Sequence, residues 1–239
     1  MKNNISKVAL VTGGSGGIGS NICKELAKKN IKVCFTHFKN KRKAEKIVKE
    51  IQKTGGSAET KKMDIRNVNS VKKTIDYFIK KNGKISILVN NSGISQVKPF
   101  KKISIKDWNN MIDVNLKGPF FLTKYFLING NKNKWCRIIN ISSSSGIHGG
   151  KVQIHYAITK AGLISLTKSL NNIYGKKNFT INAIAPGLIN TPMIKKEINL
   201  KKKNKLKIGK IKDTKEISKI ILKIISEKYK NKTGIVFKV

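Results

Sequence analysis

The sequence predicts an α/β fold in which one parallel sheet of about seven strands carries helices on both faces. Short apolar segments alternate with longer amphipathic segments along all 239 residues, at a spacing typical of repeated strand–helix units. The length suits one sizeable core, and we find neither an internal repeat nor a second domain. We therefore expect a single doubly wound domain over 1–239.

Each element is predicted from its own local pattern. The run VALVT at 8–12 is apolar and short, as a buried strand is, and a helix-forming stretch follows it. The helix at 43–53 ends near Gly55 and Gly56, which are typical residues after a helix. Residues 194–212 are Lys-rich with weak periodicity, so we expect a loop there that covers a substrate pocket. The predicted strands are 8–12, 32–36, 58–63, 85–89, 137–141, 180–184 and 235–239, and the predicted helices are 18–29, 43–53, 68–81, 105–124, 155–174 and 215–228.

The net charge is +39, from 51 Lys and Arg against 12 Asp and Glu. Nearly all the basic residues are Lys, and they are spread along the chain rather than confined to a tail. Lys, Asn and Ile are all encoded by A- and T-rich codons, so drift in base composition explains this surface, and a primary role in nucleic-acid binding is not expected. A positive surface still raises encounter rates with anionic ligands such as a nucleotide, coenzyme A or an acidic carrier protein.

No segment predicts a membrane span, a secretion signal or a metal site. No apolar run is long enough to cross a bilayer, and the first strand is too short for the apolar region of a signal peptide. The cysteines Cys23, Cys34 and Cys136 are odd in number and form no CxxC pair, so neither a disulfide framework nor a zinc site is expected. We expect a cytoplasmic protein.

A glycine-rich turn at 12–19, TGGSGGIG, joins the first strand to the first helix. Such a turn lets the backbone approach a pyrophosphate, and the helix N-terminus offers free N–H groups. The position of the turn favours a Rossmann-type dinucleotide site over a tight turn that binds nothing.

The end of the second strand bears on which dinucleotide is bound. NAD sites usually place an acid there to bond the ribose hydroxyls, but residues 36–42 contain none. Basic groups such as Lys39, close to His37, suit a 2′-phosphate, so we predict NADPH. Asp64, after the third strand, is either a hydrogen-bond acceptor for the adenine amino group or a turn residue that starts the next helix.

Tyr156 and Lys160 lie four residues apart in a predicted helix, on one face. A phenol has a pKa of about 10, and a nearby ammonium lowers it. The phenol can then protonate a carbonyl oxygen as hydride reaches the carbon. Ser143, at the carboxyl end of the fifth strand, can steady the developing oxyanion.

Together these motifs resemble those of the short-chain dehydrogenase/reductase family over essentially the whole chain. They are the TGxxxGIG form at 12–19, NNSG at 90–93, Asn115, Ser143, YAITKAG at 156–162 and Pro186-Gly187 followed by Thr191. The family usually has Ala where this chain has Ser92. Within the family, the stretches 83–94, 137–143 and 184–191 are most similar to 3-oxoacyl-acyl-carrier-protein reductases and acetoacetyl-CoA reductases.

The resemblance implies a role for each matching residue. Asn115 would hold a water in a proton relay with Lys160, Asn90 would line the cofactor near the adenosine ribose, and Ile189 and Thr191 would contact the nicotinamide carboxamide. It also implies a homotetramer, with interfaces from the segments 105–124 and 156–174. The implied catalytic residues are Asn115, Ser143, Tyr156 and Lys160, and the implied cofactor site comprises Gly13, Ser15, Gly16, Gly17, Ile18, Gly19, His37, Lys39, Asp64, Ile65, Asn91, Ser92, Gly93, Tyr156, Lys160, Pro186, Gly187, Ile189 and Thr191.

The function predicted from the sequence is NADPH-dependent reduction of a 3-oxoacyl thioester to the 3-hydroxyacyl thioester in fatty acid biosynthesis, with the acyl group on acyl carrier protein. An acetoacetyl-CoA reductase, or a dehydrogenase of a small alcohol or sugar, is the alternative within the family. An alternative of another class is a dinucleotide- or RNA-binding protein without redox chemistry. The full set Ser143, Tyr156 and Lys160 argues against that alternative, because a protein without catalysis has no need for all three.

Overall fold

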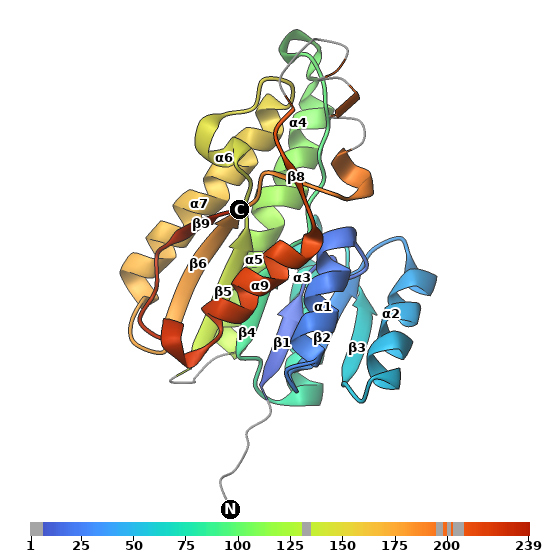
Figure 1. Ribbon diagram of the computed structural model, residues 1–239, viewed down its shortest axis with the longest axis vertical. Helices are drawn as coiled ribbons and strands as arrows, with labels where there is room; N and C mark the ends of the chain where they lie inside the picture. Colours follow the sequence, from blue (N-terminus) through green and yellow to red (C-terminus); the bar gives the residue numbers. More distant parts are fainter. Residues whose placement is uncertain (1–6, 131–134, 195–197, 200–201, 203–207) are drawn as a thin grey trace, which may run out of the picture.

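The structure, a computed structural model, describes residues 7–130, 135–194, 198–199, 202 and 208–239 (Figure 1). Within these residues, seven parallel strands form one sheet in the order β3-β2-β1-β4-β5-β6-β9. The predicted doubly wound parallel sheet is confirmed. The strands are β1 (Val8–Val11), β2 (Lys32–His37), β3 (Ala58–Lys62), β4 (Ile87–Asn90), β5 (Cys136–Ile141), β6 (Phe179–Ala185) and β9 (Val236–Lys238).

Helices cover both faces of the sheet (Figure 1). One face packs against α1 (Gly17–Ala27), α2 (Lys41–Lys53) and α9 (Thr214–Ile224). The other packs against α3 (Val68–Asn82), α5 (Gly118–Tyr125) and α7 (Ile154–Tyr174). The remaining elements are α4 (Ile105–Ile112), the short helix α6 (Ser145–His148), the 3-10 turns η1 (Phe100–Lys102), η4 (Pro192–Ile194) and η5 (Glu227–Tyr229), the π-helical turns η2 (Asp113–Lys117) and η3 (Phe126–Gly130), and the paired strands β7 (Leu188–Ile189) and β8 (Ile211–Lys212).

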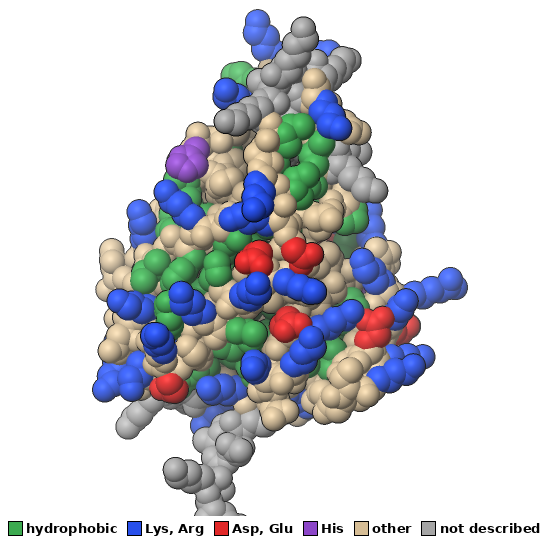
Figure 2. Space-filling view, in the orientation of Figure 1, with side chains coloured by type: hydrophobic (Ala, Val, Ile, Leu, Met, Phe, Trp, Pro, Cys, Tyr) green, Lys and Arg blue, Asp and Glu red, His purple; other side chains and the backbone are tan. Residues whose placement is uncertain are grey.

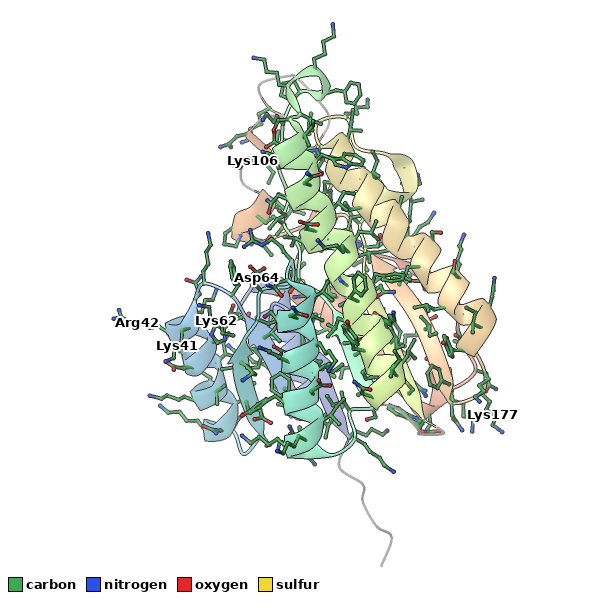
Figure 3. All side chains as sticks on the ribbon, turned by 180° about the vertical axis from the view of Figure 1, so that it is seen from behind. Lys41, Arg42, Lys62, Asp64, Lys106 and Lys177 are labelled. Carbon is green, nitrogen blue, oxygen red and sulfur yellow. The ribbon has the colours of Figure 1, made fainter. Side chains whose placement is uncertain are left out.

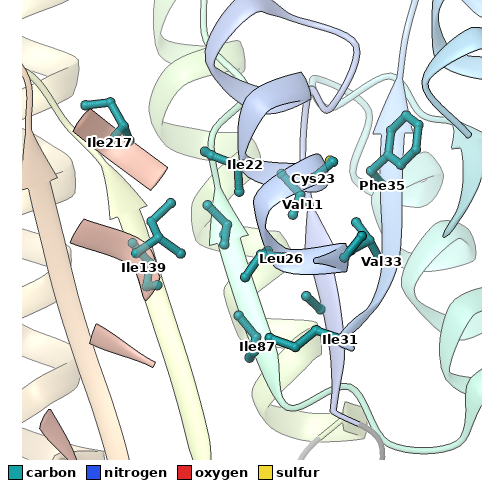
Figure 4. Packing of buried hydrophobic residues seen from close by; sticks show 14 of the residues in the cluster. Val11, Ile22, Cys23, Leu26, Ile31, Val33, Phe35, Ile87, Ile139 and Ile217 are labelled. Carbon is teal, nitrogen blue, oxygen red and sulfur yellow. The ribbon is translucent and has the colours of Figure 1, made fainter. Parts of the chain in front are cut away.

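Burial of both faces explains why the strands are continuous apolar runs. Along β1, Ala9 and Val11 belong to the core under α1, whereas Val8 and Leu10 belong to the core on the opposite face. Successive side chains of a strand point to opposite faces, so each strand serves both cores. Figure 4 shows the α1 side, where Ile22 and other apolar residues of the helix lie over the strands.

The strand order reverses between β1 and β4. Thr12, the residue after β1, connects the carboxyl ends of these two strands through hydrogen bonds. Its hydroxyl accepts the backbone N–H groups of Asn91 at 3.0 Å and Ser92 at 2.8 Å, across the two strand ends. Ligands of doubly wound sheets bind in the crevice at such a reversal. The fold therefore places the glycine-rich turn and the segment after β4 around one crevice.

The helix predicted at 105–124 is not one regular helix. It comprises α4, the π-helical turn η2, α5 and a second π-helical turn η3, which ends at Gly130. The α4 segment begins at a capping box in which Ser104 and Asp107 each bond the other's backbone N–H. Asn115 lies within η2, and π-helical turns inside helices often occur at functional sites.

On the face seen in Figure 2, basic side chains are spread out rather than gathered in one patch. Figure 2 shows Lys and Arg side chains spread over the whole face seen in Figure 1, with acidic side chains among them. Several acids are paired with lysines, as in the contact of Lys24 with Glu50 at 2.7 Å. Among the described residues, no helix is both long enough and apolar enough to cross a membrane.

Candidate active site

The glycine-rich turn packs too tightly for side chains. Gly13 has φ of +64°, which L side chains rarely adopt. A Cβ on Gly19 would collide with the Gly13 carbonyl oxygen and would lie 2.7 Å from Asn91 Nδ2. The helix α1 begins after Gly16, which provides no side-chain cap, so the first N–H groups of α1 remain available to an anion.

A cleft of about 590 Å³ opens between this turn and the ends of β2, β3 and β4. Its walls include fourteen of the predicted cofactor residues, whereas the predicted residues Tyr156, Lys160, Pro186, Gly187 and Ile189 do not line it. Residues on the walls that sequence reasoning missed include Phe38, Lys43, Arg66, Asn110 and Val114. The predicted residues on the walls are Gly13, Ser15, Gly16, Gly17, Ile18, Gly19, His37, Lys39, Asp64, Ile65, Asn91, Ser92, Gly93 and Thr191.

Asp64 is held by Arg66, and both residues line this cleft. The guanidinium donates to the carboxylate at 2.9 and 2.7 Å, and the Arg66 backbone N–H donates at 3.0 Å. These bonds hold the pKa of Asp64 below its usual value. The guanidinium also lies 5.3 Å from the centre of the Phe38 ring. Asp64, labelled in Figure 3, therefore forms a turn and also lines the cleft.

Basic residues of α2 and of the turn before it also line the cleft. Lys39 and Lys43 line it, and His37 lies beside them with its Nδ1 atom 2.9 Å from the Thr60 hydroxyl. Burial lowers the pKa of His37. This end of the cleft has cations and no acid from β2, so its residues fit a dinucleotide with an additional phosphate.

The side chain of Asn90, which we expect beside the adenosine ribose, does not line the cleft. Its side chain is buried inside the sheet, where Nδ2 donates to the Thr123 hydroxyl at 2.9 Å and to Asn140 at 2.8 Å. Side chains alternate along a strand, and Asn90 is the last residue of β4, with its side chain on the α5 side. The next residue, Asn91, lines the cleft and donates to the Thr12 carbonyl at 2.8 Å.

Tyr156 and Lys160 occupy one face of α7, one turn apart. The Lys160 ammonium lies 5.6 Å from the centre of the Tyr156 ring and donates to the Ile141 carbonyl at 2.8 Å. Only 3% of Lys160 is exposed, and burial lowers its pKa to about 8. It therefore remains mostly protonated at neutral pH, so a positive charge lies beside the phenol.

The Asn115 side chain forms hydrogen bonds with both α7 and the segment after β4. Its side chain accepts the Ile94 N–H at 2.8 Å and donates to the Ile94 carbonyl at 2.9 Å and the Thr159 hydroxyl at 3.2 Å. A Cβ on Gly93 would lie 3.4 Å from both Asn115 Oδ1 and Lys160 Nζ. The π-helical turn thus brings Asn115 to the place where Gly93 and Lys160 meet.

Ser143 follows β5 at the same edge of the sheet. It is linked to α7 through its neighbour Ser142, whose hydroxyl donates to the Lys160 carbonyl at 2.7 Å. The Ser143 hydroxyl lies 2.8 Å from that of Ser145. The predicted catalytic residues therefore come from the segment after β5, from η2 and from α7, and the Ser142 contact places Ser143 next in the chain to a residue bonded to Lys160.

A buried histidine precedes the tyrosine. His155 Nε2 lies 2.8 Å from Gln96 Oε1, and Gln96 Nε2 donates to Asp107 at 2.7 Å. Because a carboxylate only accepts, the Gln96 amide nitrogen must face Asp107, so its oxygen accepts from a protonated Nε2 of His155. Burial lowers the pKa of His155, and within the part of the chain that the structure describes its Nδ1 atom has no hydrogen-bond partner, so the neutral form of the ring is favoured.

A dinucleotide cleft beside a buried lysine, a tyrosine, an asparagine and a serine defines an oxidoreductase of carbonyl or hydroxyl groups. The family model for short chain dehydrogenases matches residues 7–202. The chain belongs to the short-chain dehydrogenase family.

Relatives of known name agree with this assignment. The chain is 37% identical over 225 residues to the 3-oxoacyl-acyl-carrier-protein reductase FabG of Aquifex aeolicus, covering 92% of this chain and 90% of the relative. It is also 37% identical over 191 residues to the acetoacetyl-CoA reductase of an Acinetobacter species, covering 79% and 76%. Among solved structures, an actinorhodin polyketide ketoreductase with NADPH is similar at a TM-score of 0.88 and 25% identity, covering 100% of this chain and 97% of that one.

Proposed function

We propose that this protein is an NADPH-dependent reductase that converts a 3-oxoacyl thioester on acyl carrier protein into the 3-hydroxyacyl thioester, in fatty acid biosynthesis. The observation that carries the proposal is the buried Lys160 ammonium 5.6 Å from the Tyr156 ring, at the edge of a dinucleotide cleft. The Aquifex aeolicus relative, which this chain matches over nearly its whole length, bears the name of this activity.

In this proposal each residue of the site has one task. Bound NADPH supplies the hydride that reaches the keto carbon. Ser143 donates a hydrogen bond to the substrate carbonyl and orients it. Tyr156 gives its phenolic proton to the oxygen as negative charge develops there. The Lys160 ammonium stabilises the phenolate that remains, and Asn115 orients the segment after β4 and belongs to the path that returns the proton.

The choice of NADPH over NADH is supported by charge. Lys39, Lys43 and Arg66 line the adenosine end of the cleft, and no acidic residue of β2 or its following turn lines it. A 2′-phosphate would gain favourable contacts there. The similar ketoreductase structure also contains NADPH.

We propose that the segment 194–212 shapes the acyl pocket. Most of this segment lies outside the described residues. The described residues at its borders support the proposal, because Pro192 and Met193 line the cleft and β7 pairs with β8. The Asn190 N–H also donates to the Lys212 carbonyl at 2.9 Å. This hydrogen bond holds the residues before and at the end of the segment close to each other.

We propose further that the enzyme is a homotetramer, as the resemblance implies, and that it is cytoplasmic, as the sequence analysis expects. Large apolar side chains are exposed on the helices expected at the interfaces. Ile105 is 79% exposed on α4 and Ile173 is 70% exposed on α7, and Trp108, Ile158 and Tyr174 are exposed nearby in the chain. A second copy would remove these surfaces from water. Sedimentation equilibrium of the purified protein tests this.

The proposed function is tested by NADPH oxidation with acetoacetyl groups on acyl carrier protein and, separately, on coenzyme A. We expect turnover with the carrier-linked thioester and a loss of about 10²- to 10⁴-fold in Tyr156→Phe, the range for removal of a general acid. Unchanged NADPH affinity in the variant would show that the cleft is intact. Equal turnover in Tyr156→Phe would refute the mechanism.

The second candidate is an acetoacetyl-CoA reductase, which the name of the Acinetobacter relative favours. The two functions share the cleft and the catalytic residues and differ in the carrier. Faster turnover of the coenzyme A thioester than of the carrier-linked one, at equal concentration, would select this candidate.

A further inference from the structure

Ser145 places a second hydroxyl beside Ser143. It is the first residue of α6, two positions after Ser143. Its Oγ atom lies 2.8 Å from the Ser143 Oγ atom, and its backbone N–H donates to the same Ser143 oxygen at 3.2 Å. The backbone N–H and the hydroxyl of Ser145 therefore both lie against the Ser143 hydroxyl oxygen.

The number of donors and acceptors decides the direction of the Ser143 hydroxyl. A hydroxyl has one hydrogen to donate and two lone pairs to accept with. The 2.8 Å distance allows either serine to be the donor. If Ser145 donates both its N–H and its O–H, the two lone pairs of Ser143 are occupied and its own hydrogen is left for a third group. A substrate carbonyl only accepts, so its arrival selects this arrangement.

The surrounding backbone holds Ser145 in this position. The Ser144 N–H donates to the Pro186 carbonyl at 2.7 Å, and the Gly146 N–H donates to the Ser143 carbonyl at 2.9 Å. A Cβ on Gly146 would lie 2.7 Å from the carbonyl carbon of Lys160, so the start of α6 rests directly on the catalytic turn of α7. The backbone around Ser145 is therefore held by α6, by α7 and by Pro186 after β6. These contacts fix the positions of the Ser143 and Ser145 hydroxyls before the substrate binds.

We propose that Ser145 is a positioning residue for the reduction, which fixes Ser143 as a hydrogen-bond donor to the carbonyl oxygen of the substrate. This inference rests on the proposed function, since it concerns the carbonyl that Ser143 orients. Hydrogen bonds in a chain strengthen one another, so donation from Ser145 also makes Ser143 a better donor as charge develops on the oxygen.

The test compares four proteins in NADPH oxidation with saturating cofactor: wild type, Ser145→Ala, Ser143→Ala and the double variant. We expect Ser145→Ala to lower kcat about fivefold to tenfold, the worth of one hydrogen bond, with little change in KM or in NADPH affinity. Ser145→Thr retains the hydroxyl and should recover most of the loss. In the Ser143→Ala background, Ser145→Ala should have no further effect, because its target is gone.

An equal loss from Ser145→Ala with and without Ser143 would overturn the inference, since that result indicates a structural role or direct substrate contact. Wild-type kcat in Ser145→Ala, with Ser143→Ala and Tyr156→Phe both impaired, would overturn the inference and leave the proposed function standing. Failure of the proposed function looks different: the wild-type protein would bind NADPH and reduce neither thioester, and both proposals would then fall.

Discussion

Replacing Lys160 by methionine is expected to make the protein more stable while abolishing its activity. The two side chains are similar in length, so the variant retains the packing of α7 and removes the charge. Lys160 is buried, and its burial lowers its pKa to about 8. A lysine in the unfolded chain has a pKa of about 10.4. Burial of the charge therefore opposes folding whenever the lysine is protonated in both states.

The magnitude follows from these two pKa values. Each tenfold change in proton affinity is worth about 1.4 kcal/mol, so the charged form destabilises the folded state by about 3 kcal/mol at pH 7. The variant also loses the 2.8 Å hydrogen bond to the Ile141 carbonyl, at about 1 kcal/mol. The net gain is about 2 kcal/mol, or about 4–8 °C in Tm for a chain of this length.

The sign of the pH dependence is fixed as well. Below pH 8 the lysine is charged in both states and the full penalty applies. As the pH rises from about 8 towards 10.4, the folded lysine loses its proton first, so the wild-type protein gains stability and the difference from the variant shrinks.

The assay is urea unfolding followed by circular dichroism at pH 7 and at pH 9.5. The control is Lys168→Met, an exposed lysine on the same helix, which should change the free energy of unfolding by less than about 0.5 kcal/mol. A Lys160→Met variant that is less stable than the wild type at pH 7 would refute the reasoning that the buried charge opposes folding.

Two further predictions concern the glycine turn and the buried histidine. Gly19→Ala should weaken NADPH binding at least tenfold and lower Tm, because the new Cβ collides with the Gly13 carbonyl. Fluorescence titration measures the affinity for NADPH. Wild-type affinity in the variant would contradict the packing described for this turn. Burial lowers the pKa of His155 in the folded state, so the folded ring takes up its proton at a lower pH than the ring in the unfolded chain, which does so as the pH falls below about 6.5. Stability contributed by the neutral ring is therefore present above that pH and is lost below it, so Tm measured from pH 8 to pH 5 should fall less steeply in His155→Gln than in the wild type. Parallel Tm profiles would show that His155 does not contribute to the acid sensitivity.

The strands could be predicted because a strand that is buried on both faces is a short run of apolar residues between turns. The order of motifs also located the glycine turn and the residues of α7. Burial of a particular lysine could not be predicted, because nothing local distinguishes Lys160 from the many exposed lysines of this chain. The role of Asn90 came from the family resemblance alone, and a resemblance does not say which face of a strand a side chain occupies; here the Asn90 side chain lies toward Thr123 and Asn140.

The π-helical turn and the Ser145 contact were missed for a different reason. Both depend on how distant elements meet: Asn115 is drawn towards Ile94 and Thr159, and Ser145 is placed by the packing of Gly146 on α7. Apolar periodicity over 105–124 predicts a helix whether its turns are α or π. The Asp64–Arg66 pair could have been suspected, because a basic residue two positions after an acid in a turn can reach it.

The π-helical turn at Asp113–Lys117 also determines how this helix can change in length. A π turn accommodates about one residue more than an α turn, so removal of one residue there would let the helix become regular. The residues after the turn would keep their direction relative to α4, because the wider turn is what accommodates the removed residue. Leu122 and Phe126 would therefore stay buried, whereas Asn115, which lies within the turn, would lose its contact with Ile94. A single-residue deletion in this segment should therefore preserve the fold and impair the site around Asn115, whereas a single-residue deletion in the regular helix α5 should disrupt the packing of Phe126.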